Sequence, residues 1–273
     1  MLYIVATPIG NLEDMTFRAV RILKEADLIA CEDTRQTRKL LDHYDIQTTM
    51  ISYHDHNEPA RASELLDRLR DGKTIALVTD AGTPLVSDPG YVLVHEARKA
   101  GLAVTPIPGA SAVLTGLSAS GLPTGEGFRF CGFPPPKKTQ RLDLFRSLAR
   151  ETATLIFYEA PHRILDALED LETAMPKRPV VVARELTKLH EEFLSGTAHE
   201  IYAKLAARDS VRGEITLMVG KASEAATEVD ERPIEEAVAE LQRAGVPRMD
   251  AIKQVARDRG LPKREVYRIL SGG

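Results

Sequence analysis

Residues 74–90 read Thr74-Ile-Ala-Leu-Val-Thr-Asp80-Ala-Gly-Thr-Pro84-Leu-Val-Ser-Asp88-Pro-Gly90. The run before Asp80 is almost wholly apolar, which is typical of a parallel strand buried on both faces. A turn should follow, because glycine and proline come next. Asp88 and the following proline are typical of a helix N-cap and first helical position. The stretch predicts a strand, a turn and a helix over 91–99, with Asp80 where open α/β sheets bind ligands. An ordinary connection, in which Asp80 only caps its own turn, fits the spacing equally well.

Strand and helix patterns alternate through the rest of the amino-terminal half. Further strands are expected at 2–6, 28–31 and 102–106, and helices near 16, over 36–43 and 59–70, and from Ser111. This alternation is typical of an α/β domain with a mainly parallel sheet. No Gly-x-Gly-x-x-Gly motif is present, which excludes the standard dinucleotide-binding fingerprint.

A glycine-rich stretch from Gly116 to Gly127 is interpreted as a linker between domains. Beyond it, strands are expected near 128–132, 154–158, 179–184 and 214–219, and helices over 161–174 and 198–208. Strands that follow strands favour a mixed sheet in this second α/β domain. Residues 221–231 are polar and alanine-rich, as in a second linker. We therefore expect domains at 1–116, 117–224 and 230–273.

The carboxyl-terminal segment has the pattern of three short helices. Ala256, Gly260 and Val266 have the spacing of a helix-turn-helix, with Lys263, Arg264 and Arg268 on or beside the last helix. Residues 245–273 carry a net charge of +4, so the remainder carries −8 in a chain of −4. A basic tail on an acidic body favours a polyanionic partner, although a solvated helical face explains the charges equally well.

The composition is that of a soluble globular protein, with 43% apolar and 28% charged residues. Neither a long apolar run nor a basic leader is present, so we expect no membrane span or signal peptide. Cys31 and Cys131 are expected to be reduced thiols in the cytoplasm. With no tryptophan and 5% aromatic residues, base stacking cannot be the main mode of RNA binding.

Several motifs carry a resemblance to a known family. They are the Asp-Ala-Gly-Thr-Pro-x4-Asp-Pro-Gly of residues 80–90 and the segments 5–12, 31–35, 52–57, 108–112, 159–163 and 184–188. Together they resemble the tetrapyrrole-methylase-type S-adenosylmethionine methyltransferases. Within that family they are most similar to the branch that methylates a ribose 2′-hydroxyl in 16S ribosomal RNA. The resemblance spans about residues 2–220, with a matching tail.

The resemblance implies S-adenosylmethionine as cofactor, held in a cleft between the two α/β domains, and a homodimeric enzyme. It implies the following cofactor-binding residues: Ile9, Asp80, Gly82, Thr83, Ser111, Ala112, Tyr158 and Leu186. Plain core packing is the alternative for the apolar Ile9, Ala112 and Leu186. Methyl transfer from a sulfonium depends on in-line positioning and exclusion of water, and turns at strand ends suit both.

The ribose hydroxyl is a very weak acid, so a base or a cation should help it to lose its proton. The candidates are Glu32, Asp33, Glu185 and Lys188. Ordinary surface ion pairs explain each of them at least as well, and the spacing does not single out one base.

Basic side chains are candidates for phosphate contacts. The proline-rich loop 132–138 and the start of the predicted helix at 161 supply some of them. The full set is Arg35, Lys137, Lys138, Arg141, Arg163, Lys263, Arg264 and Arg268. His54 and His56 have no second pair of ligands at metal-binding spacing, so we expect no metal site.

The resemblance implies an enzyme that methylates a decoding-site cytidine of 16S RNA in the small ribosomal subunit, and the basic side chains are consistent with such a substrate. One alternative is a methyltransferase of the same fold acting on a small tetrapyrrole, although the basic tail and basic loop count against it. The other is a non-enzymatic nucleic-acid-binding regulator, which would need a dimer to recognise a palindrome.

Overall fold

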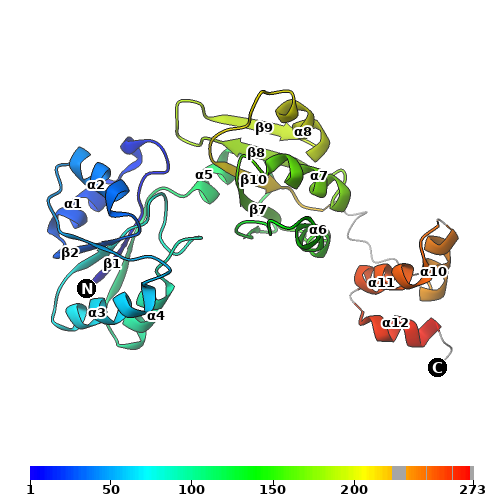
Figure 1. Cartoon of the computed structure of the whole chain (residues 1–273), viewed down its shortest axis with the longest axis horizontal. Helices are drawn as coiled ribbons and strands as arrows, with labels where there is room; N and C mark the ends of the chain where they lie inside the picture. Colours follow the sequence, from blue (N-terminus) through cyan, green and yellow to red (C-terminus); the bar gives the residue numbers. More distant parts are fainter. Residues whose placement is uncertain (223–231, 244, 260, 271–273) are drawn as a thin grey trace. The chain divides into compact units, whose positions relative to one another are not determined.

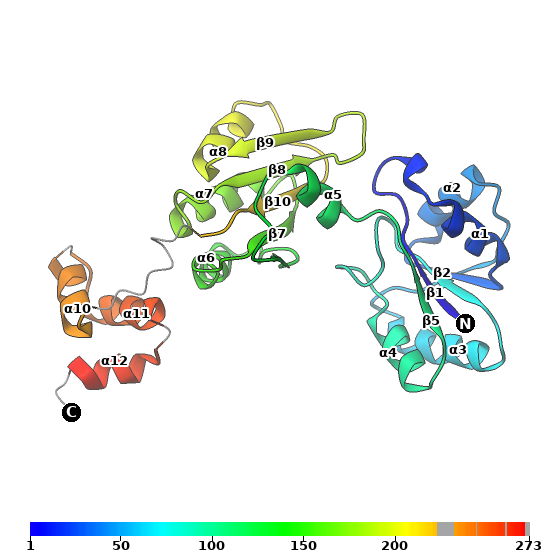
Figure 2. The same cartoon turned by 180° about the vertical axis from the view of Figure 1, so that it is seen from behind.

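The computed structural model describes residues 1–222, 232–243, 245–259 and 261–270. The chain divides into two compact units, Met1–Lys221 and Ala222–Gly273. The first unit contains two five-stranded sheets, each with its own helices (Figures 1 and 2).

The first sheet has the strand order β3-β2-β4-β1-β5. Every neighbouring pair in it is parallel, which confirms the predicted α/β class. Its strands are β1 (Leu2–Val5), β2 (Leu28–Cys31), β3 (Met50–Ser52), β4 (Ile75–Leu77) and β5 (Val104–Ile107). The apolar run that begins at residue 74 is therefore the central strand, β4.

Helices cover both faces of this sheet (Figure 1). Successive side chains on a strand point to opposite faces. Ile29 and Cys31 pack with α1 (Phe17–Glu25) and α2 (Thr34–His43). Helix α1 follows the short 3-10 helix Leu12–Asp14, and α2 follows strand β2. Leu28 and Ala30 pack with α3 (Glu58–Arg70) and α4 (Tyr91–Lys99). Burial on both faces explains why β2 is apolar at every position.

The second sheet has the order β6-β7-β10-β8-β9. Strands β6 and β7 are parallel, and the other neighbours are antiparallel, so the predicted mixed sheet is confirmed. Its strands are β6 (Phe128–Phe130), β7 (Thr154–Glu159), β8 (Val180–Arg184), β9 (Glu192–Gly196) and β10 (Ile215–Val219).

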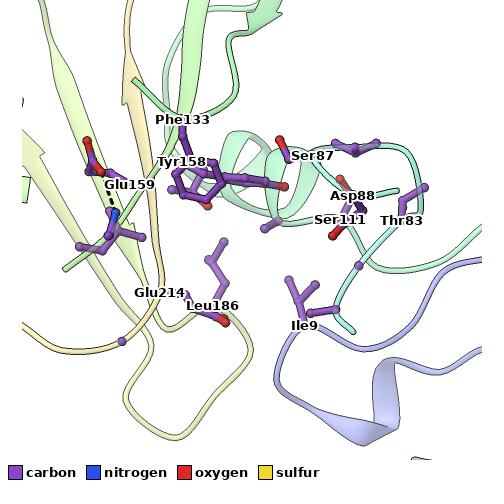
Figure 3. Close-up of a pocket in the computed structure, with 18 of the residues that line it drawn as sticks. Ile9, Thr83, Ser87, Asp88, Ser111, Phe133, Tyr158, Glu159, Leu186 and Glu214 are labelled. Atoms are coloured by element: carbon purple, nitrogen blue, oxygen red, sulfur yellow. Dashed lines mark hydrogen bonds between the residues drawn. The ribbon is translucent and has the colours of Figure 1, made fainter. Parts of the chain in front are cut away.

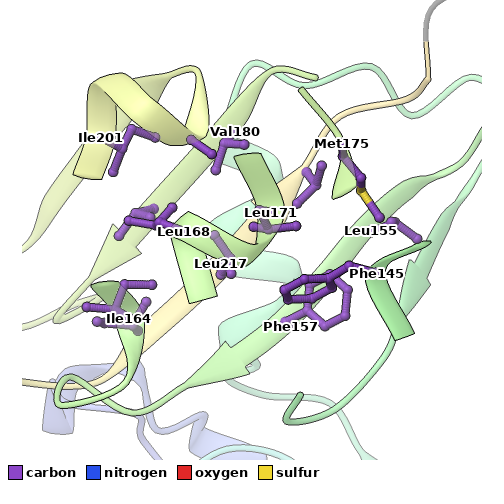
Figure 4. Packing of buried hydrophobic residues seen from close by; sticks show 14 of the residues in the cluster. Phe145, Leu155, Phe157, Ile164, Leu168, Leu171, Met175, Val180, Ile201 and Leu217 are labelled. Atoms are coloured by element: carbon purple, nitrogen blue, oxygen red, sulfur yellow. The ribbon is translucent and has the colours of Figure 1, made fainter. Parts of the chain in front are cut away.

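One face of the second sheet packs under α6 (Lys138–Ser147), α7 (Ile164–Ala174) and α8 (Ala198–Ala206). Phe145 and Phe157 meet edge to face within this core (Figure 4). The opposite face contacts α5 (Ala112–Ala119). That face also contacts Ile9, which comes from the turn after β1.

Two local predictions need correction. Gly116 lies inside α5 and not in a linker; a Cβ atom there would approach Met218 and Thr216 of β10 to 3.4 Å. A side chain at that distance would be in ordinary van der Waals contact, so residue 116 lies against the sheet as part of the helix. The predicted basic loop 132–138 is a loop as far as residue 137, but Lys138 begins helix α6 and Arg141 lies within that helix.

The second unit contains α10 (Ile234–Arg243), α11 (Arg248–Asp258) and α12 (Lys263–Leu270). They share an apolar core that includes Val238, Ile252 and Val266. The predicted turn residue Gly260, and residues 223–231 of the predicted linker, lie outside the described residues.

No helix in the described parts of the chain has the length and apolarity needed to cross a membrane. Cys31 is buried, Cys131 is half-buried, and both are free thiols.

Candidate functional site

A cavity of about 390 Å³ lies within the first unit (Figure 3). Turns at the carboxyl ends of β1, β4 and β5 form one wall, and residues in or next to β7, β8 and β10 form the other. All of the expected cofactor-binding residues except Asp80 line it: Ile9, Gly82, Thr83, Ser111, Ala112, Tyr158 and Leu186.

Hydrogen bonds join the three turns of the first wall. Thr7 and Gly82 exchange backbone N–H to O bonds of 2.8 and 3.0 Å. The Thr83 hydroxyl donates to the Ala110 carbonyl over 3.0 Å. Gly82 has a φ of 86°, which favours glycine because a Cβ atom is disfavoured there. The turn that was expected to approach a cofactor is therefore rigidly held.

Asp80 does not line the cavity. Its Oδ1 accepts a hydrogen bond from the backbone N–H of Asp33 over 3.1 Å. Burial raises the pKa of the Asp80 carboxyl, and the negative charge of Asp33 raises it further. The hydrogen bond from the Asp33 backbone lowers this pKa but does not cancel the increase. In this structure Asp80 links the ends of β4 and β2.

Asp88 is not the N-cap that the Asp-Pro sequence predicts. Helix α4 begins after Gly90, whose φ is 138°. Glu58 accepts the free N–H groups of Gly90 and Val92 over 3.0 and 3.2 Å. The carboxylate of Asp88 instead lines the cavity.

Three carboxyl groups line the cavity, and sequence reasoning missed each of them as a site residue. Glu159 is 2% exposed and lies 2.9 Å from Arg163 Nε. Glu214 accepts a hydrogen bond from Lys188 Nζ over 2.9 Å. Asp88 takes part in no ion pair with the described residues, and Figure 3 shows it on the same side of the cavity as Thr83 and Ser111. Glu159 opens one of the recognised motifs, so a signal for it existed.

The pKa of Asp88 is raised to about 6, chiefly by burial. The negative charges of Glu32, Asp80 and Asp55 raise it further, and hydrogen bonding to Thr79 opposes them. Across the cavity, burial and then the charge of Asp88 raise the pKa of Tyr158 to about 12.

None of the four catalytic candidates lines the cavity. Glu32 accepts a hydrogen bond from the buried Thr79 hydroxyl over 3.2 Å, and burial raises the pKa of its carboxyl. Asp33 pairs with Arg35 over 2.7 Å, and hydrogen bonds from Arg35 lower its pKa to about 2. Asp33 is therefore held as a charged ion-pair partner.

Glu185 and Lys188 lie in the turn after β8. Lys188 Nζ donates to Glu185 over 2.8 Å as well as to Glu214. These carboxylates raise the pKa of Lys188 despite its partial burial. Glu185 and Thr187 adopt positive φ values of 54° and 65°, and Asn11 donates its N–H to Thr187 Oγ1 over 3.1 Å. This strained turn is tied to the turn after β1.

An aromatic pair borders the cavity from the second sheet. Phe133 is 54% exposed, and its ring centroid lies 5.6 Å from that of Tyr158. Sequence analysis assigned Tyr158 and missed Phe133, because the latter lies in a loop read only for its basic residues. The pair supplies an apolar surface against which a flat ring can pack.

Arg141 does not face solvent as the RNA-contact prediction requires. It is 2% exposed, and its Nε donates to Asp170 over 2.7 Å. Arg163 is mostly buried as well, since it binds Glu159 and donates to the Pro134 carbonyl over 2.6 Å. We therefore leave Arg141 out of the RNA contacts.

The other predicted RNA contacts are more open. Arg35 is 87% exposed at its side chain although it pairs with Asp33. Lys137 and Lys138 are exposed at the start of α6. In the second unit Lys263, Arg264 and Arg268 are exposed on α12.

Comparison with known sequences gives a family. The sequence profile described as Tetrapyrrole (Corrin/Porphyrin) Methylases matches residues 1–202. A ribosomal RNA small subunit methyltransferase I of Halalkalibacterium halodurans is 52% identical over 98% of this chain and 93% of its own length. The protein of that name from Bacillus subtilis is 45% identical over 98% of this chain and 92% of its own.

Solved structures share the fold at low sequence identity. A uroporphyrin-III C-methyltransferase from Thermus thermophilus, complexed with S-adenosyl homocysteine, superposes with a TM-score of 0.55 at 21% identity, over 80% of this chain and 96% of its own. A diphthine synthase gives a TM-score of 0.60 at 15% identity, over 83% and 92%. These likenesses concern the fold alone.

Proposed function

Because the chain belongs to the tetrapyrrole methylase family, in the group of ribosomal RNA small subunit methyltransferases I, we propose that it methylates 16S ribosomal RNA. The methyl group comes from S-adenosylmethionine, and the acceptor is the ribose 2′-hydroxyl of a decoding-site cytidine in the small subunit. The observation that carries this proposal is the sequence identity of 45–52%, over nearly the full length of the chain, to two ribosomal RNA small subunit methyltransferases I. The cavity between the two sheets supplies the site.

The cavity suits the cofactor in size and chemistry. Its volume of about 390 Å³ lies in the range of small-molecule sites. Ile9, Ala112 and Leu186 offer apolar surface, and the hydroxyls of Thr83 and Ser111 offer polar contacts. Asp88 is a carboxylate without a cationic partner among the described residues, which suits a positively charged ligand. When bound, S-adenosylmethionine supplies an electrophilic methyl group on a sulfonium sulfur.

The residues of the chain position the reactants and exclude water. The rigid turns fix the first wall, and the aromatic pair of Phe133 and Tyr158 gives the second wall an apolar surface. A largely apolar lining helps to keep water away from a reactive methyl donor. Lys188, held by Glu185 and Glu214, is a fixed cation beside this site.

Methyl transfer to purified small ribosomal subunits tests this function. Radiolabelled S-adenosylmethionine should label 16S RNA at one ribose, and 2′-O-methyl mapping should place the label in the decoding site. Labelling of a small tetrapyrrole instead would support the first alternative. Sequence-specific DNA binding without methyl transfer would support a regulator.

We also propose that the enzyme is a homodimer in the cytoplasm. Phe17 and Leu189 are 97% and 93% exposed, and burying such apolar side chains at an interface would be favourable. Light scattering at micromolar concentration should give twice the chain mass. A monomer would contradict this part of the proposal.

The exposed cations of α12 should bind the phosphate groups of the RNA. Changing Lys263, Arg264 and Arg268 together to alanine should weaken binding to small subunits and flatten the log–log salt dependence by about three units, close to one per lost contact. Affinity for S-adenosylmethionine should stay the same, because the proposed cofactor site lies in the first unit. Filter binding across a salt series measures the slope.

A matched control is the triple alanine variant of Arg68, Arg70 and Lys99, which are exposed on α3 and α4. It removes the same charge but should leave the salt slope close to that of the wild type. Equal slopes for all three proteins would contradict a role of α12 in RNA binding.

A further inference from the structure

The cavity offers few groups that can accept a proton. Glu159 is held by Arg163, and Glu214 by Lys188. Each of these two carboxylates therefore already has a cationic partner. Asp88 lines the same cavity and forms no ion pair with the described residues.

The other groups nearby are poor proton acceptors for a different reason. Tyr158 keeps its proton at neutral pH because burial raises its pKa to about 12. Lys188 stays protonated because two carboxylates raise its pKa. The Thr83 hydroxyl donates to the Ala110 carbonyl, and a neutral alcohol is a far weaker base than a carboxylate.

The backbone holds Asp88 at the cavity. Leu85 and Ser87 adopt left-handed φ values of 71° and 66°, which are costly for residues with a Cβ atom. Glu58 supplies the helix cap that Asp88 would otherwise supply. The segment therefore adopts unfavourable backbone angles, and its Asp-Pro pair does not cap the helix. The carboxylate of Asp88 lies instead against the ligand cavity.

The surroundings of Asp88 favour proton uptake. Glu32 follows β2, Asp80 follows β4 and Asp55 follows β3, and their negative charges all act on Asp88. Hydrogen bonding to Thr79 opposes them in part. A carboxylate that is partly buried among like charges and has no cationic partner binds a proton near neutral pH.

From this geometry we propose that Asp88 is the general base of the methyl transfer, a step that rests on the proposed function. The O–H bond of the ribose breaks, and its proton passes to a carboxylate oxygen of Asp88. The hydroxyl oxygen forms a bond to the methyl carbon, and the carbon–sulfur bond breaks with its electron pair remaining on sulfur. The products are a 2′-O-methyl ribose, a neutral thioether and a protonated Asp88, which then releases its proton to solvent.

The test compares Asp88→Asn and Asp88→Glu with the wild type, using S-adenosylmethionine and small ribosomal subunits at saturation. Asp88→Asn keeps the shape but cannot take the proton, so its single-turnover rate should fall by about 10²–10⁴-fold. The wild-type rate should rise with pH as Asp88 loses its proton and level off once its carboxylate is ionised. The rate of Asp88→Asn should not rise with pH in this way, and Asp88→Glu should recover part of the wild-type rate. The exposed Asp67→Asn variant of α3 is the control that keeps the wild-type rate.

A second measurement needs no activity. The folded-state pKa of Asp88 lies above its ordinary value, so the folded state binds more protons between about pH 4 and pH 6. Stability should therefore fall as pH rises through that window, and the loss should be complete above pH 6. Asp88→Asn lacks this loss, so its melting temperature relative to the wild type should rise between pH 4 and pH 6.

The outcomes separate this inference from the function on which it rests. If the wild type methylates subunits while Asp88→Asn keeps its rate and pH profile, the assignment of Asp88 is overturned and the function stands. If Asp88→Asn only raises the calorimetric Kd for S-adenosylmethionine and keeps the saturated rate, Asp88 is a cofactor ligand and not the base. If the wild type transfers no methyl group to subunits, the function and the assignment fall together.

Discussion

Changing Asp170 to leucine should lower the free energy of unfolding by about 3–5 kcal/mol. Asp170 is 1% exposed and Arg141 is 2% exposed, and Arg141 Nε and Nη2 both lie 2.7 Å from Asp170 Oδ2. Arginine does not give up its proton, so the variant leaves a buried charge whose one remaining acceptor among the described residues is the Pro136 carbonyl at 3.3 Å. Urea denaturation followed by circular dichroism measures the loss.

A surface ion pair on α6, the helix that carries Arg141, provides the control. Asp143 of α6 is 67% exposed at its side chain and lies 4.0 Å from Arg146, so Asp143→Leu should cost no more than about 1 kcal/mol. The double variant Arg141→Met with Asp170→Leu should recover much of the stability, because it removes both buried charges. Equal losses for Asp170→Leu and Asp143→Leu would contradict this account.

Buried central strands could be predicted from sequence because their apolar runs are local signals. β2 was placed at 28–31 and β4 within 74–79, in agreement with the structure. β3 and β9 were not predicted, and both are edge strands. An edge strand pairs on one side only, and most of the residues in these two are half-buried, so neither carries a strong apolar pattern.

Long-range pairing explains the errors at individual side chains. Arg141 belongs to a basic segment, and nothing local shows that Asp170 lies against it. Asp88 has the local signature of an N-cap, but Glu58 from another helix takes that role. Such competition between distant groups cannot be read from spacing.

The two walls of the cavity also differ in how far their residues could be predicted from the sequence. The first wall consists of turns at strand ends, where glycine, proline and small polar residues mark the position in the sequence. Most of the second wall depends on which face of the second sheet a residue occupies and on a loop beside it. The family resemblance supplied Tyr158 and Leu186 there, whereas Phe133, Glu159 and Glu214 came only from the structure.

Changing Ala112 to tryptophan should raise the Kd for S-adenosylmethionine at least about 100-fold, which corresponds to about 2.7 kcal/mol. Ala112 is the first residue of α5, lines the cavity and is half-buried. An indole ring at this position would fill a large part of a cavity of about 390 Å³. The side chain of Ser111, which caps the helix by accepting from Leu114, is untouched. Calorimetric titration measures the Kd.

Ser118→Trp is the matched control, because Ser118 is exposed on the same helix and does not line the cavity. It adds the same ring and should leave the Kd unchanged. Neither variant buries a polar group or opens a core cavity, so both should melt within a few degrees of the wild type. A folded Ala112→Trp protein that binds S-adenosylmethionine as tightly as Ser118→Trp would show that the cofactor binds elsewhere, since a blocked cavity cannot hold a ligand of that size.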